Sequence, residues 1–448
     1  MKIGRYLKLL VALLLIATAV PVAAIELGGS VRDAVTGDPL VNVEVCTLDC
    51  RVFSDQEGNF QLQTDAGRII VRAPGYRPLM ASTAVPLHLA LEPFVPKALY
   101  LSFWGADSRR KRQQIRDLLV TTQVNALVID IKSSRGHIAY RSNIPLARQI
   151  GAQQVRPLKD LPEFLDELKA QGIYTIARMV VFKDDLLAKN RPEFAVQTED
   201  GEIWEDREKL SWSDPFNPQV QEYNLAVAEE AAQLGFDEVQ FDYIRFPANS
   251  DLRFSQESND ESRVAAINSF LGKAKERLAP YPVFTSANIF GYICWKHRDG
   301  KIGQRLVDLG DRVDYLSPML YPSGFPNGIP AYSDPVSHPY EVIAHSLQRA
   351  RQLSGLAAIR FRPWLQSFRD YAFDRRRFTA VEVHAQINAS DASGSHGWML
   401  WNAASRFSLA SLQQELPPGE LKLADTAPTA EEPTLLTRTE QDLSTPPL

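Results

Sequence analysis

Hydrophobic and polar positions follow two different patterns along the chain, and the pattern changes near residue 95. Before that point, short apolar or alternating runs at 41–45, 60–63 and 68–71 are separated by clusters of Gly, Pro, Asp and Asn. Runs of this length between turn residues are typical of β-strands, and their regular spacing suggests a sandwich. The pattern therefore predicts a small all-β module over residues 26–92.

From about residue 97 to 408, runs of strand length alternate with helical periods. The candidate strands are 98–103, 126–131, 174–182, 238–243, 283–289, 315–321, 359–366 and 397–401. Apolar residues at helical spacing lie between them, at 161–170, 220–234, 264–278, 341–353 and 378–387. A doubly wound sheet would alternate similarly, but no Gly-rich dinucleotide-binding turn follows the first strand. Eight such units predict an α/β fold, a (β/α)8 TIM barrel.

The two ends of the chain differ from both of these regions. Basic residues near the start, the apolar run 9–20 and the small residues 22–24 are typical of an export signal, with cleavage after Ala24. We therefore expect a periplasmic or secreted protein with no membrane span after cleavage; an uncleaved anchor is the alternative. Residues 415–448 are rich in Pro, Thr, Ser and Glu, which predicts a disordered tail.

Composition narrows the function classes. With 45% hydrophobic and 23% charged residues, the chain is typical of a globular protein. The net charge is −5 and no basic stripe occurs, so we expect no nucleic-acid partner. The histidines lack zinc-site spacing and no cofactor motif is present, so neither a metal nor a cofactor is expected. Cys46 and Cys50 could close a small disulfide loop or stay free thiols.

Charged residues interrupt three of the predicted barrel strands at one level. By strand alternation, Asp130 and Lys132 face the barrel axis with Val128, and so do Arg178 and Asp242. These residues lie toward the carboxyl ends of their strands, and TIM barrels carry their active sites at that end. We expect Arg178 to hold the neighbouring carboxylates ionised, which suits a nucleophile or base in glycosidic-bond cleavage. A purely structural ion-pair network is the alternative.

Substrate contacts are expected from residues at the same strand ends. Arg245 could bind a substrate hydroxyl or hold a carboxylate, and flat aromatic rings can stack on sugar faces. Ordinary packing is the alternative for these rings. The aromatic residues at the strand ends are Trp104, Tyr243, Phe246, Tyr321, Trp364, Trp398 and Trp401, of which Trp104, Tyr321, Trp364 and Trp401 are our candidates.

Several local strings across the barrel share one family pattern. The most specific is FDYIRFP at 241–247, and the others are NALVIDIK at 125–132, ARMVVFKD at 177–184, WSDPFN at 212–217, SPMLYP at 317–322, RPWLQ at 362–366 and GWMLWN at 397–402. Together they resemble a glycoside hydrolase family of TIM barrels that was formerly classed as a domain of unknown function. The resemblance spans about 97–405. It implies hydrolysis of glycans, with Asp242 at the position of the key carboxylate.

The sequence departs from this family pattern where acidic residues are usual. Ser133 and Ser134 follow the second strand, Asn288 lies on the fifth and Ser367 follows the seventh. Asp130 and Asp214 remain as candidates for the acid. The departures motivate a second hypothesis, a non-catalytic glycan-binding or envelope-scaffold protein on the same barrel.

The N-terminal module has a resemblance of its own. The stretches 29–40, 55–60 and 73–76 resemble the carboxypeptidase regulatory-like domain, which implies a prealbumin-like accessory sandwich without catalytic residues. The sequence thus predicts an exported glycoside hydrolase that acts on a cell-envelope or extracellular polysaccharide.

Overall fold

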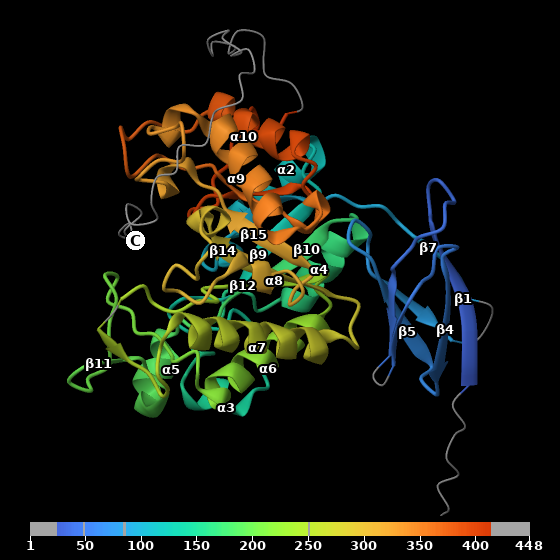
Figure 1. The fold of residues 1–448 in the computed structure, drawn as a ribbon, viewed down its shortest axis with the longest axis horizontal. Coiled ribbons are helices and arrows are strands. Elements are labelled where there is room, and N and C mark those ends of the chain that lie inside the picture. Colours follow the sequence, from blue (N-terminus) through green and yellow to red (C-terminus); the bar gives the residue numbers. More distant parts are fainter. Residues whose placement is uncertain (1–24, 48–49, 84–86, 250, 414–448) are drawn as a thin grey trace, which may run out of the picture.

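The computed structural model describes residues 25–47, 50–83, 87–249 and 251–413, and its two parts are a helix-covered barrel and a β module beside it (Figure 1). The expected export signal and the C-terminal tail lie outside the described residues. Within those residues, no helix has both the length and the apolar character needed to cross a membrane.

The N-terminal module consists of two small sheets that share one core. The first sheet has the order β4-β1-β7 and the second the order β3-β2-β5-β6. The strands are β1 (Ile25–Asp33), β2 (Glu44–Cys46), β3 (Arg51–Phe53), β4 (Asn59–Thr64), β5 (Arg68–Arg72), β6 (Leu79–Ser82) and β7 (Leu87–Leu91). Val31 and Leu62 from the first sheet pack with Val45 and Ile69 from the second. The predicted sandwich is therefore present.

Eight parallel strands close the barrel in the order β10-β12-β14-β15-β16-β17-β8-β9. They are β8 (Lys97–Leu101), β9 (Ala126–Lys132), β10 (Tyr174–Val180), β12 (Glu238–Asp242), β14 (Phe284–Phe290), β15 (Tyr315–Met319), β16 (Trp364–Gln366) and β17 (Trp398–Trp401). Each lies within a predicted strand or overlaps most of it. Only β16 is much shorter than predicted, because residues 358–360, at the start of the predicted strand 359–366, form a 3-10 turn. The TIM barrel prediction is confirmed.

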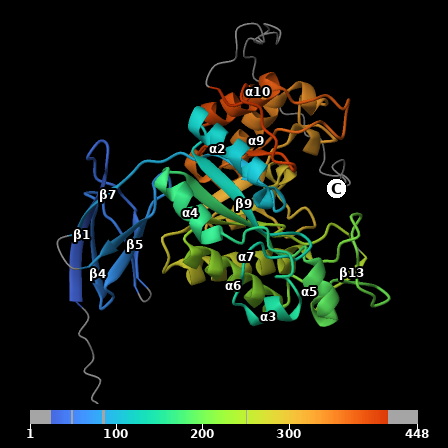
Figure 2. The same cartoon turned by 180° about the vertical axis from the view of Figure 1, so that it is seen from behind.

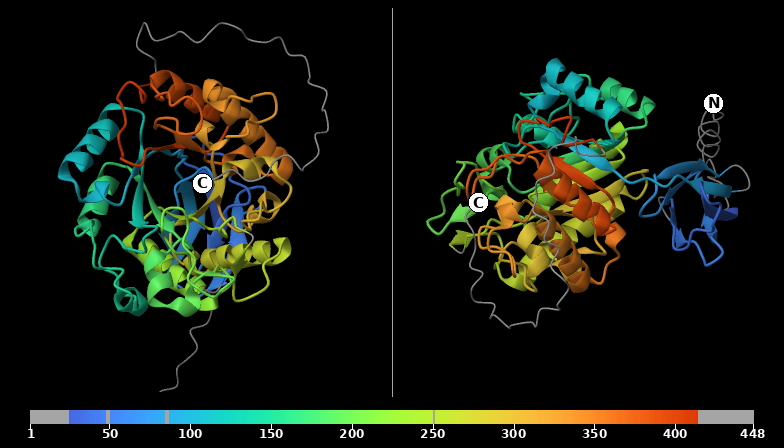
Figure 3. Two further views of the ribbon diagram at one scale, coloured as in Figure 1. Left: turned by 90° about the vertical axis from the view of Figure 1, so that its left-hand side faces the viewer. Right: turned by 90° about the horizontal axis from the view of Figure 1, so that it is seen from above.

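Helices surround the strands, as the left view of Figure 3 shows. They are α2 (Arg109–Thr121), α3 (Pro145–Gln149), α4 (Leu161–Ala170), α5 (Asp185–Asn190), α6 (Pro218–Leu234), α7 (Asp260–Leu278), α8 (Leu306–Leu309), α9 (Pro339–Ser354) and α10 (Ala380–Ala392). Seen from behind, α2 and α4 lie outside β9 (Figure 2). Two short strands, β11 (Gln197–Thr198) and β13 (Leu252–Arg253), pair outside the barrel.

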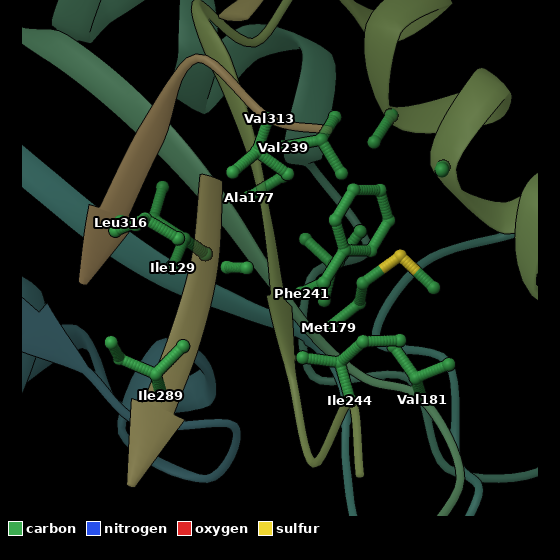
Figure 4. Packing of buried hydrophobic residues seen from close by; sticks show 14 of the residues in the cluster. Ile129, Ala177, Met179, Val181, Val239, Phe241, Ile244, Ile289, Val313 and Leu316 are labelled. Atoms are coloured by element: carbon green, nitrogen blue, oxygen red, sulfur yellow. The ribbon is translucent and has the colours of Figure 1, made fainter. Parts of the chain in front are cut away.

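Strand alternation divides the barrel into two hydrophobic cores. Val128 and Ile176 belong to a cluster in the lumen, whereas Ile129, Ala177 and Phe241 pack toward the helices (Figure 4). Residues of opposite parity face opposite sides of a strand. The inward parity expected for Val128 is therefore correct, and it sets which polar residues reach the lumen.

The module contacts the barrel at the amino-terminal ends of its strands. The Cys46 thiol donates to the Ala279 carbonyl at 3.3 Å, and Arg72 donates to the Val283 carbonyl at 2.9 Å. Cys46 and Cys50 are free, so the first of the two alternatives, a loop disulfide, is not formed. The Cys46 thiol is buried in this contact, and the opposite end of the barrel is left uncovered by the module.

Candidate active site

The charged row expected from alternation is present in the lumen. The Arg178 guanidinium on β10 lies between two carboxylates, Asp130 on β9 and Asp242 on β12. Its Nη1 donates to Asp130 Oδ1, while Nε and Nη2 donate to Asp242 Oδ2, with 2.8 Å for the Nε bond. Each of the three residues is 5% exposed. A buried guanidinium paired in this way is oriented by both carboxylates, which satisfies the desolvated charges.

The remaining carboxylate oxygens are also engaged. The Tyr100 hydroxyl donates to Asp130 Oδ2 at 2.5 Å, and the Tyr243 backbone N–H donates to Asp242 Oδ1 at 2.6 Å. Tyr243 adopts a left-handed conformation with φ of 48°, which is uncommon for a residue with a large side chain. That conformation follows directly after β12 and turns the Tyr243 N–H back toward the Asp242 carboxylate.

Burial and charge act in opposite directions on this row. Burial raises the pKa of the Asp130 carboxyl, and the neighbouring Arg178 and Tyr100 offset only part of that effect. At Asp130, desolvation therefore outweighs the attraction of Arg178, so the pKa of this carboxyl lies above its ordinary value. Burial alone would lower the pKa of Arg178, but the two carboxylates raise it above its usual range.

A pocket of about 410 Å³ opens above Arg178 and Asp242 at the carboxyl ends of the strands. Its aromatic walls are Tyr243, Phe290, Tyr321, Trp364, Phe368, Tyr371 and Trp401. The Arg178 guanidinium lies 4.9 Å from the Trp401 ring centre, which is within cation–π range. Of the carboxylates in the described residues, Asp242 alone lines this pocket, and Asp130 lies below it. The site thus presents one carboxylate to a ring-lined cavity.

Three of the four aromatic candidates line this pocket: Tyr321, Trp364 and Trp401. Trp364 is fully buried, and its Nε1 donates to Asn288 Oδ1 at 2.9 Å. Asn288, where the family pattern has an acidic residue, therefore positions this indole. Trp104 is 64% exposed and lies outside the pocket lining, because it precedes the 3-10 turn η1 (Gly105–Asp107) on the surface.

Asp214 lies outside the charged row and outside the pocket lining. Its two oxygens accept backbone N–H bonds from Phe216 at 2.9 Å and Ser255 at 2.7 Å. The carboxylate therefore joins two loop segments. Nothing in its position supports the acid role considered from the sequence.

Lys132 does not join the row, so its expected inward direction is wrong. The pairing of β9 with β10 shifts after Arg178, so that Met179 pairs with Lys132 and Ile131 is the extra residue of a bulge. A bulge changes the direction of the side chains that follow it. Lys132 instead pairs with Asp184 at 2.7 Å, both fully buried.

A second, larger pocket of about 770 Å³ adjoins the first. The two share Tyr243, Arg245 and Phe290 in their linings. Trp204 and Trp212, from the long connection between β10 and α6, form part of the second lining. Sequence reasoning found Arg245 but missed these two indoles, because only the folded loop brings them beside β12. Within the described residues, no group of His, Cys, Asp and Glu is arranged to hold a metal ion.

Residues 98–407 match the family described as "Putative glycosyl hydrolase domain". The chain belongs to this family. A hypothetical protein from Ruminiclostridium thermocellum is 39% identical, with a TM-score of 0.38, over 42% of this chain and 96% of that one. Membership makes this barrel a glycosyl hydrolase-like domain, which implies a carbohydrate substrate.

Two more distant structures were also found. The PgaB (BpsB) glycoside hydrolase domain from Bordetella bronchiseptica is 11% identical, with a TM-score of 0.50, over 72% of this chain and 100% of that one. Alpha-L-fucosidase isoenzyme 2 from Paenibacillus thiaminolyticus is 14% identical, with a TM-score of 0.49, over 71% of this chain and 48% of that one. At such identities, the PgaB likeness supports the barrel fold alone. No curated protein matches.

Proposed function

We propose that this protein hydrolyses a glycosidic bond in a cell-envelope or extracellular polysaccharide, with Asp242 as the carboxylate that acts on the sugar. The observation that carries this proposal is the position of Asp242, which alone among the described carboxylates lines the pocket at the carboxyl ends of the strands. Trp401 and Tyr321 line the same cavity and offer ring faces and a hydroxyl to a sugar. Family membership supports the same reaction class.

The bonds of Asp242 favour a base or nucleophile over an acid. Both of its oxygens accept N–H bonds, from Arg178 and from the Tyr243 backbone, which is the pattern of an ionised carboxylate. A general acid must instead carry a proton to the leaving oxygen. Asp130 has a raised pKa but reaches the pocket only through Arg178, so we assign it as a positioning residue.

The test is a hydrolysis screen on the full chain. Purified protein is incubated with envelope and extracellular polysaccharides, and new reducing ends are measured over time. We expect release of reducing ends from at least one polysaccharide. Binding without any release across the set would contradict hydrolysis.

A glycan-binding protein without turnover is the second candidate. Most glycoside hydrolases use two carboxyl groups flanking the scissile bond, and within the described residues this pocket presents one. Asn288 binds the Trp364 indole where the family pattern has an acidic residue. The screen separates the two candidates, since this one gives binding without reducing ends.

We further propose that the protein is exported, and that residues 26–92 form a carboxypeptidase regulatory-like accessory module. Its packing against the amino-terminal ends of the barrel strands is consistent with an accessory role, because it leaves the pocket end uncovered. Fractionation of the producing cells tests export: recovery of the protein in the cytosol with residues 1–24 intact would contradict it.

A further inference from the structure

The second pocket, beside the one that holds Asp242, has no role in the proposal above. It is nearly twice as large, about 770 Å³ against about 410 Å³. Because Tyr243, Arg245 and Phe290 belong to both linings, an extended ligand at Asp242 can continue into it.

The carboxylates that line this second pocket are already paired with lysines. Asp206 and Glu208 both bind Lys183, at 2.8 Å and 2.7 Å. Glu205 binds Lys189 at 3.1 Å. These three carboxylates form no ion pair with the other cations of the lining in the described residues, although Asp206 still acts on Arg245 from a distance.

Three cations of the lining, Arg207, Arg245 and Lys296, form no ion pair among the described residues, and of these Arg207 is exposed while the other two are half-buried. Arg245 donates one hydrogen bond, from Nη1 to the Phe246 carbonyl at 3.1 Å, and it forms no ion pair there. Its guanidinium lies 5.0 Å from the Trp212 ring centre and 5.3 Å from that of Tyr243. Lys296, half-buried in the same lining, forms neither a hydrogen bond nor an ion pair with its side chain in the described part of the chain.

Burial opposes the charge of both groups. Burial lowers the pKa of Arg245 and that of Lys296. Nearby carboxylates, Asp242 and Asp206 for Arg245 and Asp299 for Lys296, offset only part of this effect. An anion bound beside either cation would restore part of the lost solvation. A planar guanidinium with free N–H groups suits a carboxylate or a sulfate, which can accept two of its bonds at once.

We propose that the second pocket binds an anionic substituent of the glycan, a carboxylate or sulfate on a sugar ring adjoining the one at Asp242. Arg245 and Lys296 supply the charge, and the indole of Trp212 packs beside the Arg245 guanidinium. The inference rests on the proposed function in one respect: the ligand is a glycan. It narrows the substrate class to acidic polysaccharides.

The test is equilibrium binding by calorimetry, with the full chain and paired probes. The probes are uronate-containing and sulfated oligosaccharides, each with its carboxyl-reduced or desulfated counterpart. We expect the acidic member of at least one pair to bind about tenfold or more tightly, as a charged hydrogen bond would give. The preference should weaken with added salt and should be lost in Lys296→Gln.

Lys169→Gln is the matched control, because it removes the same charge from an exposed position in the last turn of α4, at the other end of the barrel. This variant should keep the preference. Equal affinity within every pair, or a preference that survives Lys296→Gln, overturns the inference. The uronate and sulfate arms show which anion is bound.

Hydrolysis is measured separately on the same probes. Release of reducing ends without an acidic preference would support the proposed function and overturn this inference. A preference for the acidic probes without any release of reducing ends would support this inference and contradict the proposed hydrolysis.

Discussion

Replacing Asp242 with Asn tests the catalytic assignment, because it removes the charge while nearly preserving the volume. In the structure, Asp242 accepts two N–H bonds from Arg178 and one from the Tyr243 backbone. Arg178 retains Asp130 as an ion-pair partner after the change. The free energy of unfolding should therefore fall by about 1.5–3 kcal/mol, the range for charged hydrogen bonds, and not by the ~3–5 kcal/mol of a buried charge left alone.

The effect on turnover should be much larger than the effect on stability. If Asp242 acts on the sugar, turnover should fall by about three to four orders of magnitude, as for other catalytic carboxylates. That loss corresponds to roughly 4–5.5 kcal/mol of transition-state stabilisation. The assay measures reducing ends per folded molecule, with the folded fraction taken from urea denaturation of the same preparation.

Asp237→Asn is the control for this experiment. Asp237 directly precedes β12, at the opposite end of the strand from Asp242, and accepts bonds from the Thr175 backbone and hydroxyl. The control should lose some stability and keep its turnover. A destabilised Asp242→Asn protein with undiminished turnover per folded molecule would refute the catalytic assignment and leave the structural ion-pair interpretation.

Three further predictions concern stability and thiol chemistry. Lys132→Met leaves Asp184 fully buried without its cation and should cost about 3–5 kcal/mol in urea unfolding; a loss below about 1 kcal/mol would contradict the buried pair. Burial lowers the pKa of His396 to about 3, below its unfolded value near 6.5. Protonation therefore favours unfolding, so this stabilisation is present above about pH 6.5 and is lost as the pH falls, by up to about 1.4 kcal/mol per pH unit. In His396→Gln, the free energy of unfolding should depend less on pH below about 6.5, and an unchanged pH dependence would refute this prediction. A thiol reagent should label Cys50 in the native protein well before Cys46, whose pKa burial raises, and equal labelling rates would contradict the buried contact.

Much of the barrel was predictable from the sequence because its strands and helices carry different periods. The run Leu161–Ala170 has helical spacing and forms α4 with those bounds. Helix α2 was missed, because most of its residues are charged or polar and it buries only Ile115 and Leu119. Strand alternation also placed Arg178 between Asp130 and Asp242. It succeeded because no bulge precedes any of these three residues in its strand.

The rest of the site depends on tertiary structure that local pattern does not contain. The bulge after Asp130 redirected Lys132, and it is visible only in the pairing of β9 with β10. The second pocket needs the long segment after β10 to fold back against the end of β12, so Trp212 reaches Arg245 across many residues of chain. Trp104 and Trp401 are both tryptophans at the end of a predicted strand, but Trp104 precedes a surface turn and is exposed to solvent.

The left-handed backbone at Tyr243 carries a consequence for how this site could change in evolution. Glycine or asparagine adopts such a φ at lower cost than tyrosine, so selection for stability alone would favour replacing it. The tyrosine ring forms a wall of both pockets, and the strained backbone aims an N–H at Asp242. Strain of this kind persists where it serves a function. On the proposed function, lineages of this family without hydrolytic activity should lose this tyrosine early, and those under selection for turnover should retain it despite the conformational penalty.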